Sequence, residues 1–129
     1  ATATVPLVSI VLRKGYGGGY YAMGGGRAFN ATAAFAWPSA EICAMSIHGA
    51  VDIAYRKDYE SAEDPQQSRQ AMIDAIREQT SALHAAEDFG IDDVIDPRRT
   101  RQILIETFNT CAPRRPDRSP PRRRSISPI

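Results

Sequence analysis

Residues 13–23 read RKGYGGGYYAM, and this stretch decides how the first half of the chain folds. An apolar run at residues 5–12 precedes it and predicts a buried strand, with Pro6 confined to the strand's first residues. We interpret residues 15–19 as a turn, followed by a short helix that the glycines at 24–26 end. Glycine lets main-chain N–H groups approach a ligand, and a helix start adds a partial positive charge. The stretch therefore predicts a cradle for a phosphate or an oxyanion.

The glycine pattern by itself fits other structures as well. A P-loop is excluded, because no Gly-Lys-Ser/Thr follows. Gly17, Gly19 and Ala22 match a dinucleotide fingerprint, but the glycines at 24–26 would break the long helix that such a site needs. A tight turn between strand and helix with no ligand is the remaining interpretation. The stretch alone leaves these alternatives open.

The rest of the chain alternates short apolar runs with helical patterns, which predicts an α/β layer arrangement. Residues 33–37 and 40–45 predict strands, and residues 49–55 predict a helix. Asp64 and Pro65 predict the start of a long helix that stops near Gly90. We expect its buried face to carry Met72, Ile76, Leu83 and Ala86.

The last ordered elements follow that helix. Residues 91–95 predict an extended segment, and Asp96-Pro97 opens another helix. We expect this helix to pack inward through Ile103, Leu104 and Phe108.

Charge divides the 129 residues into a body and a tail. Residues 1–112 carry ten Lys and Arg against fourteen Asp and Glu, whereas residues 113–129 carry six Arg against one Asp. The tail also holds five prolines, so we expect it to be disordered or loosely draped. A short basic patch without aromatic residues does not indicate a nucleic-acid partner.

The cysteines and the lengths of the apolar runs indicate the cellular compartment. Cys43 and Cys111 form no disulfide framework and no metal clip, and Cys43 lies in an apolar run that predicts a buried thiol. No apolar run is long enough to cross a membrane, and no signal peptide is recognisable. We expect a cytoplasmic protein. The chain begins with Ala1 and enters a strand almost at once, so we also expect it to be a piece of a longer protein.

Several separated motifs occur in an order that identifies a family. They are VP at 5–6, RKGYGGGY at 13–20, AWPSAEI at 36–42, Met45, GAV at 49–51, YRK at 55–57, IDDVIDP at 91–97, TR at 100–101 and PI at 128–129. Together they resemble the carboxyltransferase β subunit of biotin-dependent acyl-CoA carboxylases, of the propionyl-CoA and acetyl-CoA type. The resemblance covers nearly the whole chain, which makes it far more specific than the glycine pattern alone.

The resemblance implies a fold and a reaction. The fold would be a crotonase-like ββα superhelix, with this chain forming the last part of a C-terminal half. The reaction would move a carboxyl group from carboxybiotin, held on a carrier domain of a partner subunit, to the α-carbon of an acyl-CoA. In the family, the released biotin nitrogen removes the substrate α-proton, so no side-chain base is required. The chain shows no metal-ligand cluster, and we expect no metal.

The resemblance also implies site residues. In the family, amides of the glycine motif hold the ureido oxygen of biotin, and the matching positions are Gly18 and Gly19. Two such donors would stabilise the negative charge that develops on this oxygen. Gly17 would provide the turn, and the biotin cleft would be shaped by Tyr16, Tyr20 and Tyr21. The identity of Tyr21 leaves the preferred acyl chain open.

One departure from the family pattern concerns Ser46, which stands where the family has glycine. If the backbone there needs a positive φ, Ser46 would strain the loop by about 1–2 kcal/mol. A larger departure is that the N-terminal half, which in the family supplies the CoA pocket, is not in this sequence.

The resemblance implies partners as well. They are a biotin carboxylase and biotin carrier subunit, and further copies of the chain, because family active sites lie between halves of different subunits. We expect the isolated chain to be inactive. An inactive truncated remnant, or a structural fragment that serves assembly, is the main alternative, and nucleotide binding by the glycine loop is another.

Overall fold

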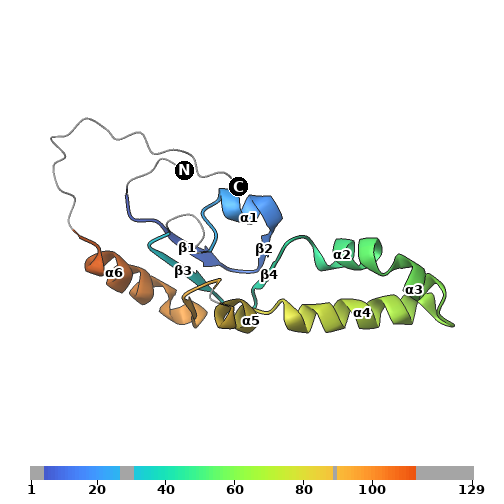
Figure 1. Cartoon of the computed structure of the whole chain (residues 1–129). Coiled ribbons are helices and arrows are strands. Elements are labelled where there is room, and N and C mark those ends of the chain that lie inside the picture. Colours follow the sequence, from blue (N-terminus) through green and yellow to red (C-terminus); the bar gives the residue numbers. More distant parts are fainter. Residues whose placement is uncertain (1–4, 27–30, 89, 113–129) are drawn as a thin grey trace, which may run out of the picture.

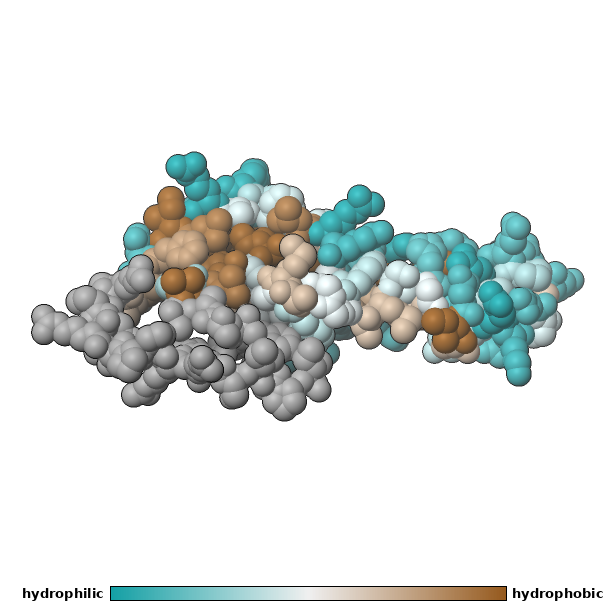
Figure 2. All heavy atoms as spheres, turned by 90° about the horizontal axis from the view of Figure 1, so that it is seen from above, coloured by the Kyte–Doolittle hydropathy of each residue, from teal (hydrophilic) through white to brown (hydrophobic). Residues whose placement is uncertain are grey.

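The computed structural model describes residues 5–26, 31–88 and 90–112, which form two parts. The strands lie in one part, and an arm of helices from residues 47–79 extends away from them (Figure 1). Apolar side chains gather over the strand-containing part, whereas the arm presents mainly hydrophilic side chains (Figure 2). Within the described ranges, the helices are too short or too polar to cross a lipid bilayer.

The larger sheet has three parallel strands in the order β1 (Val8–Val11), β3 (Ala33–Ala36) and β5 (Asp93–Val94). All four residues of β3 are buried, because the central strand of a parallel sheet is covered on both faces. The strands predicted at 5–12, 33–37 and 91–95 are thereby confirmed over shorter lengths.

Two helices cover the two faces of this sheet. Ala82 of α5 (Ala82–Glu87) belongs to the same core cluster as Ala34 and Ala36. Ile103 of α6 (Thr100–Thr110) packs instead against the cluster that contains Phe35. Neighbouring residues of β3 thus face different helices, as the alternation of side chains along a strand requires.

Helix α6 follows a 3-10 turn, η2 (Pro97–Arg99), that Asp96 caps by accepting from the Arg98 N–H at 2.9 Å. The prediction that Asp96-Pro97 opens a helix is confirmed, and so is the inward packing of Ile103. The prediction for Phe108 is wrong, since it is 47% exposed. Helix α6 contacts the sheet through its first half, where Thr100 Oγ1 accepts from Trp37 Nε1 at 3.0 Å.

A second, two-stranded sheet pairs β2 (Lys14–Tyr16) in parallel with β4 (Glu41–Cys43). Helix α1 (Gly17–Ala22) follows β2 without an intervening loop. The predicted turn over residues 15–19 is therefore wrong in detail, because Gly17 makes the change of direction alone with φ at 53°. The helix does end before the glycines at 24–26, two of which have positive φ.

The arm consists of α2 (Ile47–Ala54), α3 (Arg56–Glu60) and α4 (Pro65–Gln79). Asp64 caps α4 as predicted, by accepting from the N–H groups of Gln66 and Gln67 at 3.0 Å each. The arm has its own small core, whose buried members are Ile47, Val51, Tyr59 and Ile73. The helix predicted at 49–55 is confirmed as α2, which begins two residues earlier.

The long helix predicted from Pro65 to the neighbourhood of Gly90 is wrong, because it is two helices. The break falls at Thr80 and Ser81, whose backbone pairs with the neighbouring strand β4. The carbonyl oxygen of Thr80 accepts from the Ile42 N–H at 3.0 Å, and Ser81 bridges to Glu41. Ser81 then caps α5 through its side chain. Met72, Ile76 and Ala86 of the predicted face do pack against core clusters. The prediction for Leu83 is wrong, since it is 65% exposed, and the fully buried Ile73 was not predicted.

Candidate functional site

The glycine loop begins at Tyr16, whose extended backbone leads directly into α1. Gly17 follows with φ at 53°, a conformation that residues with a side chain rarely adopt. A Cβ atom at Gly17 would lie 2.6 Å from the carbonyl oxygen of Ala44. Both facts require glycine at position 17, where the loop passes close to the chain that leaves β4.

Gly18 and Gly19 have a different environment. A Cβ atom at either position would have no neighbour within 4 Å, so both glycines border open space. Their amides belong to the first turn of α1, where no carbonyl four residues earlier is available within the helix. Within the part of the chain that the structure describes, no carbonyl outside α1 accepts from them either. The loop therefore presents two main-chain donors at an accessible position.

The three tyrosines around the loop lie in different places. The Tyr20 ring packs inward, so closely that a Cβ at Gly25 would come within 2.2 Å of it. Burial raises the pKa of the Tyr20 phenol. Tyr21 lies on the outside of α1 and is 47% exposed, with its ring centroid 5.4 Å from that of Tyr20. Tyr20 thus holds α1 against the core, and Tyr21 is the tyrosine of α1 that remains open to solvent.

Tyr16 takes part in a network that the sequence analysis did not predict. Its hydroxyl donates a hydrogen bond to Glu41 Oε2, and Arg77 Nε donates to Glu41 Oε1 at 3.2 Å. Arg77 Nη1 also donates to Asp74 Oδ1 at 3.0 Å. The network joins β2, β4 and α4 at the carboxylate of Glu41.

The charges in this network are well defined. Partial burial and the hydrogen bond to Glu41 raise the pKa of Tyr16 to about 12. The hydrogen bonds from Tyr16 and Arg77 lower the pKa of Glu41. Near neutral pH the cluster is therefore a neutral phenol, a carboxylate and a guanidinium.

Part of this network could have been predicted. Tyr16 and Glu41 both lie in the motifs that identify the family, and pairing of the two short strands would bring them together. The contribution of Arg77 has no signal in the sequence, because it depends on how α4 packs.

Ser46 and Cys43 differ from their predictions. Ser46 has φ at −61° and accepts from the Gly49 N–H at 3.2 Å, so it caps α2 without strain. Cys43 is half-buried rather than buried, and its Sγ lies 2.7 Å from the carbonyl oxygen of Met45. Burial raises the pKa of the Cys43 thiol, which makes it a weak nucleophile near neutral pH.

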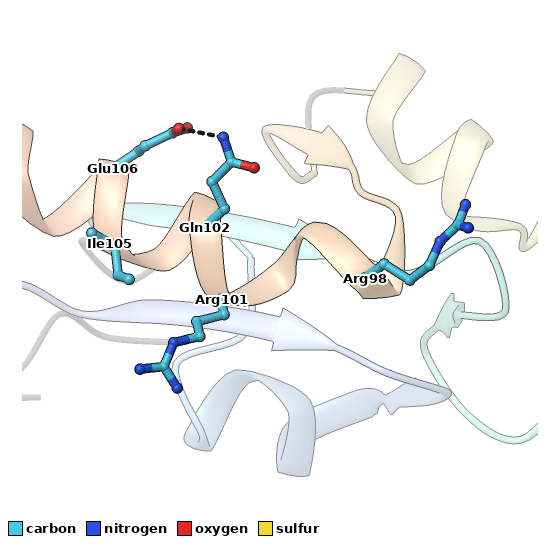
Figure 3. A pocket seen from close by; sticks show the side chains of 5 residues that line it. All are labelled: Arg98, Arg101, Gln102, Ile105 and Glu106. Atoms are coloured by element: carbon cyan, nitrogen blue, oxygen red, sulfur yellow. Dashed lines mark hydrogen bonds between the residues drawn. The ribbon is translucent and has the colours of Figure 1, made fainter.

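A shallow hollow of 430 Å³ lies on α6 and η2, and none of the predicted site residues lines it. Its walls are Arg98, Arg101, Gln102, Ile105 and Glu106, whose long side chains point in different directions (Figure 3). Arg98 is already bound to Asp96 at 2.8 Å, and Gln102 donates to Glu106 at 2.8 Å. The polar groups do not converge, so the hollow is a poor candidate for a binding site.

The described residues do not include a group of three or more His, Cys, Asp or Glu that could hold a metal ion. The candidate site consists of a glycine loop with exposed main-chain donors and of the Tyr16–Glu41–Arg77 network that supports it.

Comparison with known proteins identifies the family. The chain belongs to the carboxyl transferase domain family, which it matches over residues 1–126. It is 44% identical over 104 residues to the propionyl-CoA carboxylase carboxyltransferase subunit of Haloferax mediterranei. The aligned residues cover 80% of this chain and 20% of that protein. It is 40% identical over 117 residues to the methylmalonyl-CoA carboxyltransferase 12S subunit of Propionibacterium freudenreichii subsp. shermanii, covering 90% of this chain and 22% of that subunit.

A solved structure supports the same assignment. The transcarboxylase 12S crystal structure, described as a hexamer with methylmalonyl-coenzyme A and methylmalonic acid bound, matches with a TM-score of 0.76 and 40% identity. The match covers 90% of this chain and 23% of that chain. The predicted class, an α/β crotonase-like fold of which this chain is a part, is confirmed. The chain spans about a fifth of the length of the curated relatives that it matches.

Proposed function

We propose that the chain is part of a biotin-dependent acyl-CoA carboxyltransferase. The proposed reaction moves a carboxyl group from carboxybiotin to the α-carbon of an acyl-CoA. Membership of the carboxyl transferase family supports it, together with relatives that are named for propionyl-CoA and methylmalonyl-CoA. The acyl chain that this protein prefers stays open.

Gly18 and Gly19 are the proposed catalytic residues, and the observation that carries this role is the open space in front of both. When bound, carboxybiotin would supply the carboxyl group. The amides of Gly18 and Gly19 would donate to its ureido oxygen and stabilise the negative charge that develops there. The position is compatible with such a group, because a Cβ at either glycine would have no neighbour within 4 Å and no described carbonyl outside α1 competes for the donors.

The other loop residues would shape or support the site without taking part in the reaction. Gly17 would set the direction of the loop by its positive φ, and Tyr21 would form part of the biotin wall from its exposed position. Tyr16 and Tyr20 would support the loop from the strand side and the core side, respectively.

We also propose the partners that such a reaction needs. They are a biotin carboxylase and biotin carrier subunit that presents carboxybiotin, and further copies of the carboxyltransferase chain. The hexamer described for the 12S relative supports the second of these. The body, residues 1–112, would carry the fold, whereas the predicted tail at 113–129 lies outside the described residues.

The test replaces Gly18 or Gly19 with valine in the native assembly that contains this chain. A side chain at either position would block the approach of a ligand to the amides, so we expect the turnover number for carboxyl transfer to free biotin to fall by about a hundredfold or more. Ala22→Val is the matched control, since it adds a branched side chain at the exposed far end of the same helix. Transfer unchanged in both glycine variants would contradict the assignment.

The same preparation separates the alternatives. If the wild-type assembly is folded but transfers no carboxyl group, the inactive-remnant hypothesis is correct. If NAD raises the melting temperature and biotin does not, the loop is a nucleotide site instead.

A further inference from the structure

The side chain of Tyr16 connects the glycine loop to the rest of the fold. Its hydroxyl donates to Glu41, and Glu41 also accepts from Arg77. Tyr16 is the last residue of β2 and immediately precedes Gly17, so any rotation of its backbone changes the direction of the first turn of α1. The hydrogen bond between Tyr16 and Glu41 therefore restrains the residue whose backbone sets the direction of the Gly18 and Gly19 amides.

Backbone hydrogen bonds alone hold this part of the loop weakly. Strand β2 has three residues, and among the described strands it pairs with β4 alone. A strand of this length on one partner leaves its last residue prone to fraying. A side-chain hydrogen bond from that last residue supplies a further constraint where the ladder ends.

Glu41 is a firm anchor for this constraint, because its own segment is bound on two sides. Its N–H donates to the carbonyl oxygen of Arg13 at 2.7 Å, and the next N–H, of Ile42, donates to Thr80 at 3.0 Å. The Glu41 side chain is 23% exposed. Tyr16 is thus tied to a residue that β2 and the end of α4 already fix.

Arg77 makes this arrangement compatible with an anion site. An unpaired carboxylate close to a developing negative charge would oppose it. Arg77 bonds Glu41 at 3.2 Å and is itself held by Asp74 at 3.0 Å. The guanidinium offsets the charge of Glu41 and leaves its second oxygen for the Tyr16 hydroxyl.

We propose that Tyr16, Glu41 and Arg77 are positioning residues that hold the amides of Gly18 and Gly19 in their productive orientation. This inference rests on the proposed function, because it assigns the network to the same carboxyl-transfer step. None of the three need touch the substrate. Their contribution is to remove motion from the donors before the charge develops, which is what an oxyanion site requires.

The test uses Tyr16→Phe in the native assembly, with Tyr59→Phe as its matched control. Tyr59 donates to Asp52 at 3.2 Å, and Asp52 also binds an arginine, so both substitutions remove a phenol that bonds a carboxylate–arginine pair. Tyr59 lies in the arm and has no proposed part in the reaction. The amides of Gly18 and Gly19 would stabilise charge that develops in the transition state, so their displacement should affect turnover more than binding. We therefore expect Tyr16→Phe to lower kcat by about tenfold, with KM changed by less than about twofold.

A second pair of variants tests the anchor. Glu41→Gln keeps an oxygen that can accept from Tyr16, whereas Glu41→Ala removes it. We expect Glu41→Gln to retain more of the turnover number than Glu41→Ala, and Glu41→Ala to lose at least as much as Tyr16→Phe.

The outcomes separate this inference from the proposed function. If the wild type transfers carboxyl groups, Gly18→Val abolishes transfer, and Tyr16→Phe has the same kcat as Tyr59→Phe, the positioning role is wrong and the proposed function stands. If the folded wild type transfers nothing, both are wrong. If Tyr16→Phe raises KM at constant kcat, Tyr16 contacts the ligand directly and the positioning role is again overturned.

Discussion

Two clusters in this molecule have the same chemistry but different surroundings. In the loop cluster, Tyr16 donates a hydrogen bond to Glu41, and Arg77 binds the same carboxylate with one nitrogen at 3.2 Å. In the arm cluster, Arg69 binds Asp52 with two nitrogens at 2.7 and 2.9 Å, and the tyrosine is the more distant partner at 3.2 Å. The largest cause that lowers the carboxylate pKa is the phenol of Tyr16 for Glu41 and the guanidinium of Arg69 for Asp52.

This difference indicates what each cluster does. The arm cluster is a bidentate salt bridge that holds α2 to α4 within the arm that extends away from the strands (Figure 1). The loop cluster instead fixes the backbone residue from which α1 starts. We expect the arm cluster to contribute to stability without affecting the reaction. The loop cluster should affect the reaction more than stability.

The largest expected effect concerns the core of the arm. Ile73→Ala removes most of a fully buried side chain, so we expect it to destabilise the arm by about 3 kcal/mol. Hydrogen exchange measured by mass spectrometry should be faster in residues 47–73 and unchanged in 14–22, because Glu41 holds Arg77 at the far end of α4 independently of Ile73. The kcat of the folded enzyme should stay the same. Faster exchange in the glycine loop would show that the two regions are coupled.

Gly17→Ala should change hydrogen exchange in the glycine loop and not in the arm, the reverse of Ile73→Ala. Its positive φ and the contact with the Ala44 carbonyl oxygen both oppose a side chain, so we expect a local cost of about 2 kcal/mol or more. Hydrogen exchange should become faster in residues 14–22 and not in the arm. Gly18→Ala is the control, because its Cβ enters open space and alanine favours the helix by up to about 1 kcal/mol. Equal exchange in the two variants would contradict the described loop geometry.

The ionisation of Tyr16 gives a spectroscopic measure of the loop cluster. Its pKa is raised from 10.0 to about 12, so its stabilising effect is complete below about pH 10 and is lost as the pH rises through 12. In an absorbance titration of the tyrosines, the Tyr16→Phe variant should lack one ionisation near pH 12 that the wild type shows. Glu41→Gln should lower the Tyr16 pKa only in part, because burial is the larger cause. An unchanged late ionisation in Tyr16→Phe would assign it to another residue.

The smallest expected effect compares the two carboxylates directly. Both Glu41 and Asp52 have lowered pKa values, so each stabilises the fold above its ordinary pKa, 4.5 or 3.8, and loses that effect as the pH falls. The main cause is Tyr16 for Glu41 and Arg69 for Asp52. Carboxyl NMR titration should therefore show a larger rise of the Glu41 pKa in Tyr16→Phe than of the Asp52 pKa in Tyr59→Phe. Equal rises would remove the distinction between the clusters.

Local signals in the sequence predicted most of the elements. The pairing of Asp64 with Pro65 specified the start of α4, and the apolar run at 33–37 specified the strand β3. The break at Thr80 and Ser81 could not be read in this way, because it exists only where that backbone meets β4. The helical pattern continues through both residues, and tertiary hydrogen bonds override it.

The candidate site was predictable to a similar degree. Several separated motifs in their order identified the family, and the glycines among them identified the loop, since Gly17 depends on backbone geometry that few residues allow. The inward packing of Tyr20 and the role of Arg77 were not predictable, because both depend on how α1 and α4 rest on the strands.

A crystal structure of the native assembly with biotin bound tests the central claim most directly. We expect the biotin ureido oxygen to lie about 2.7–3.1 Å from the amide nitrogen of Gly18 or Gly19, as for other oxyanion donors. Biotin bound elsewhere, or both amides bonded to protein carbonyls, would contradict the account.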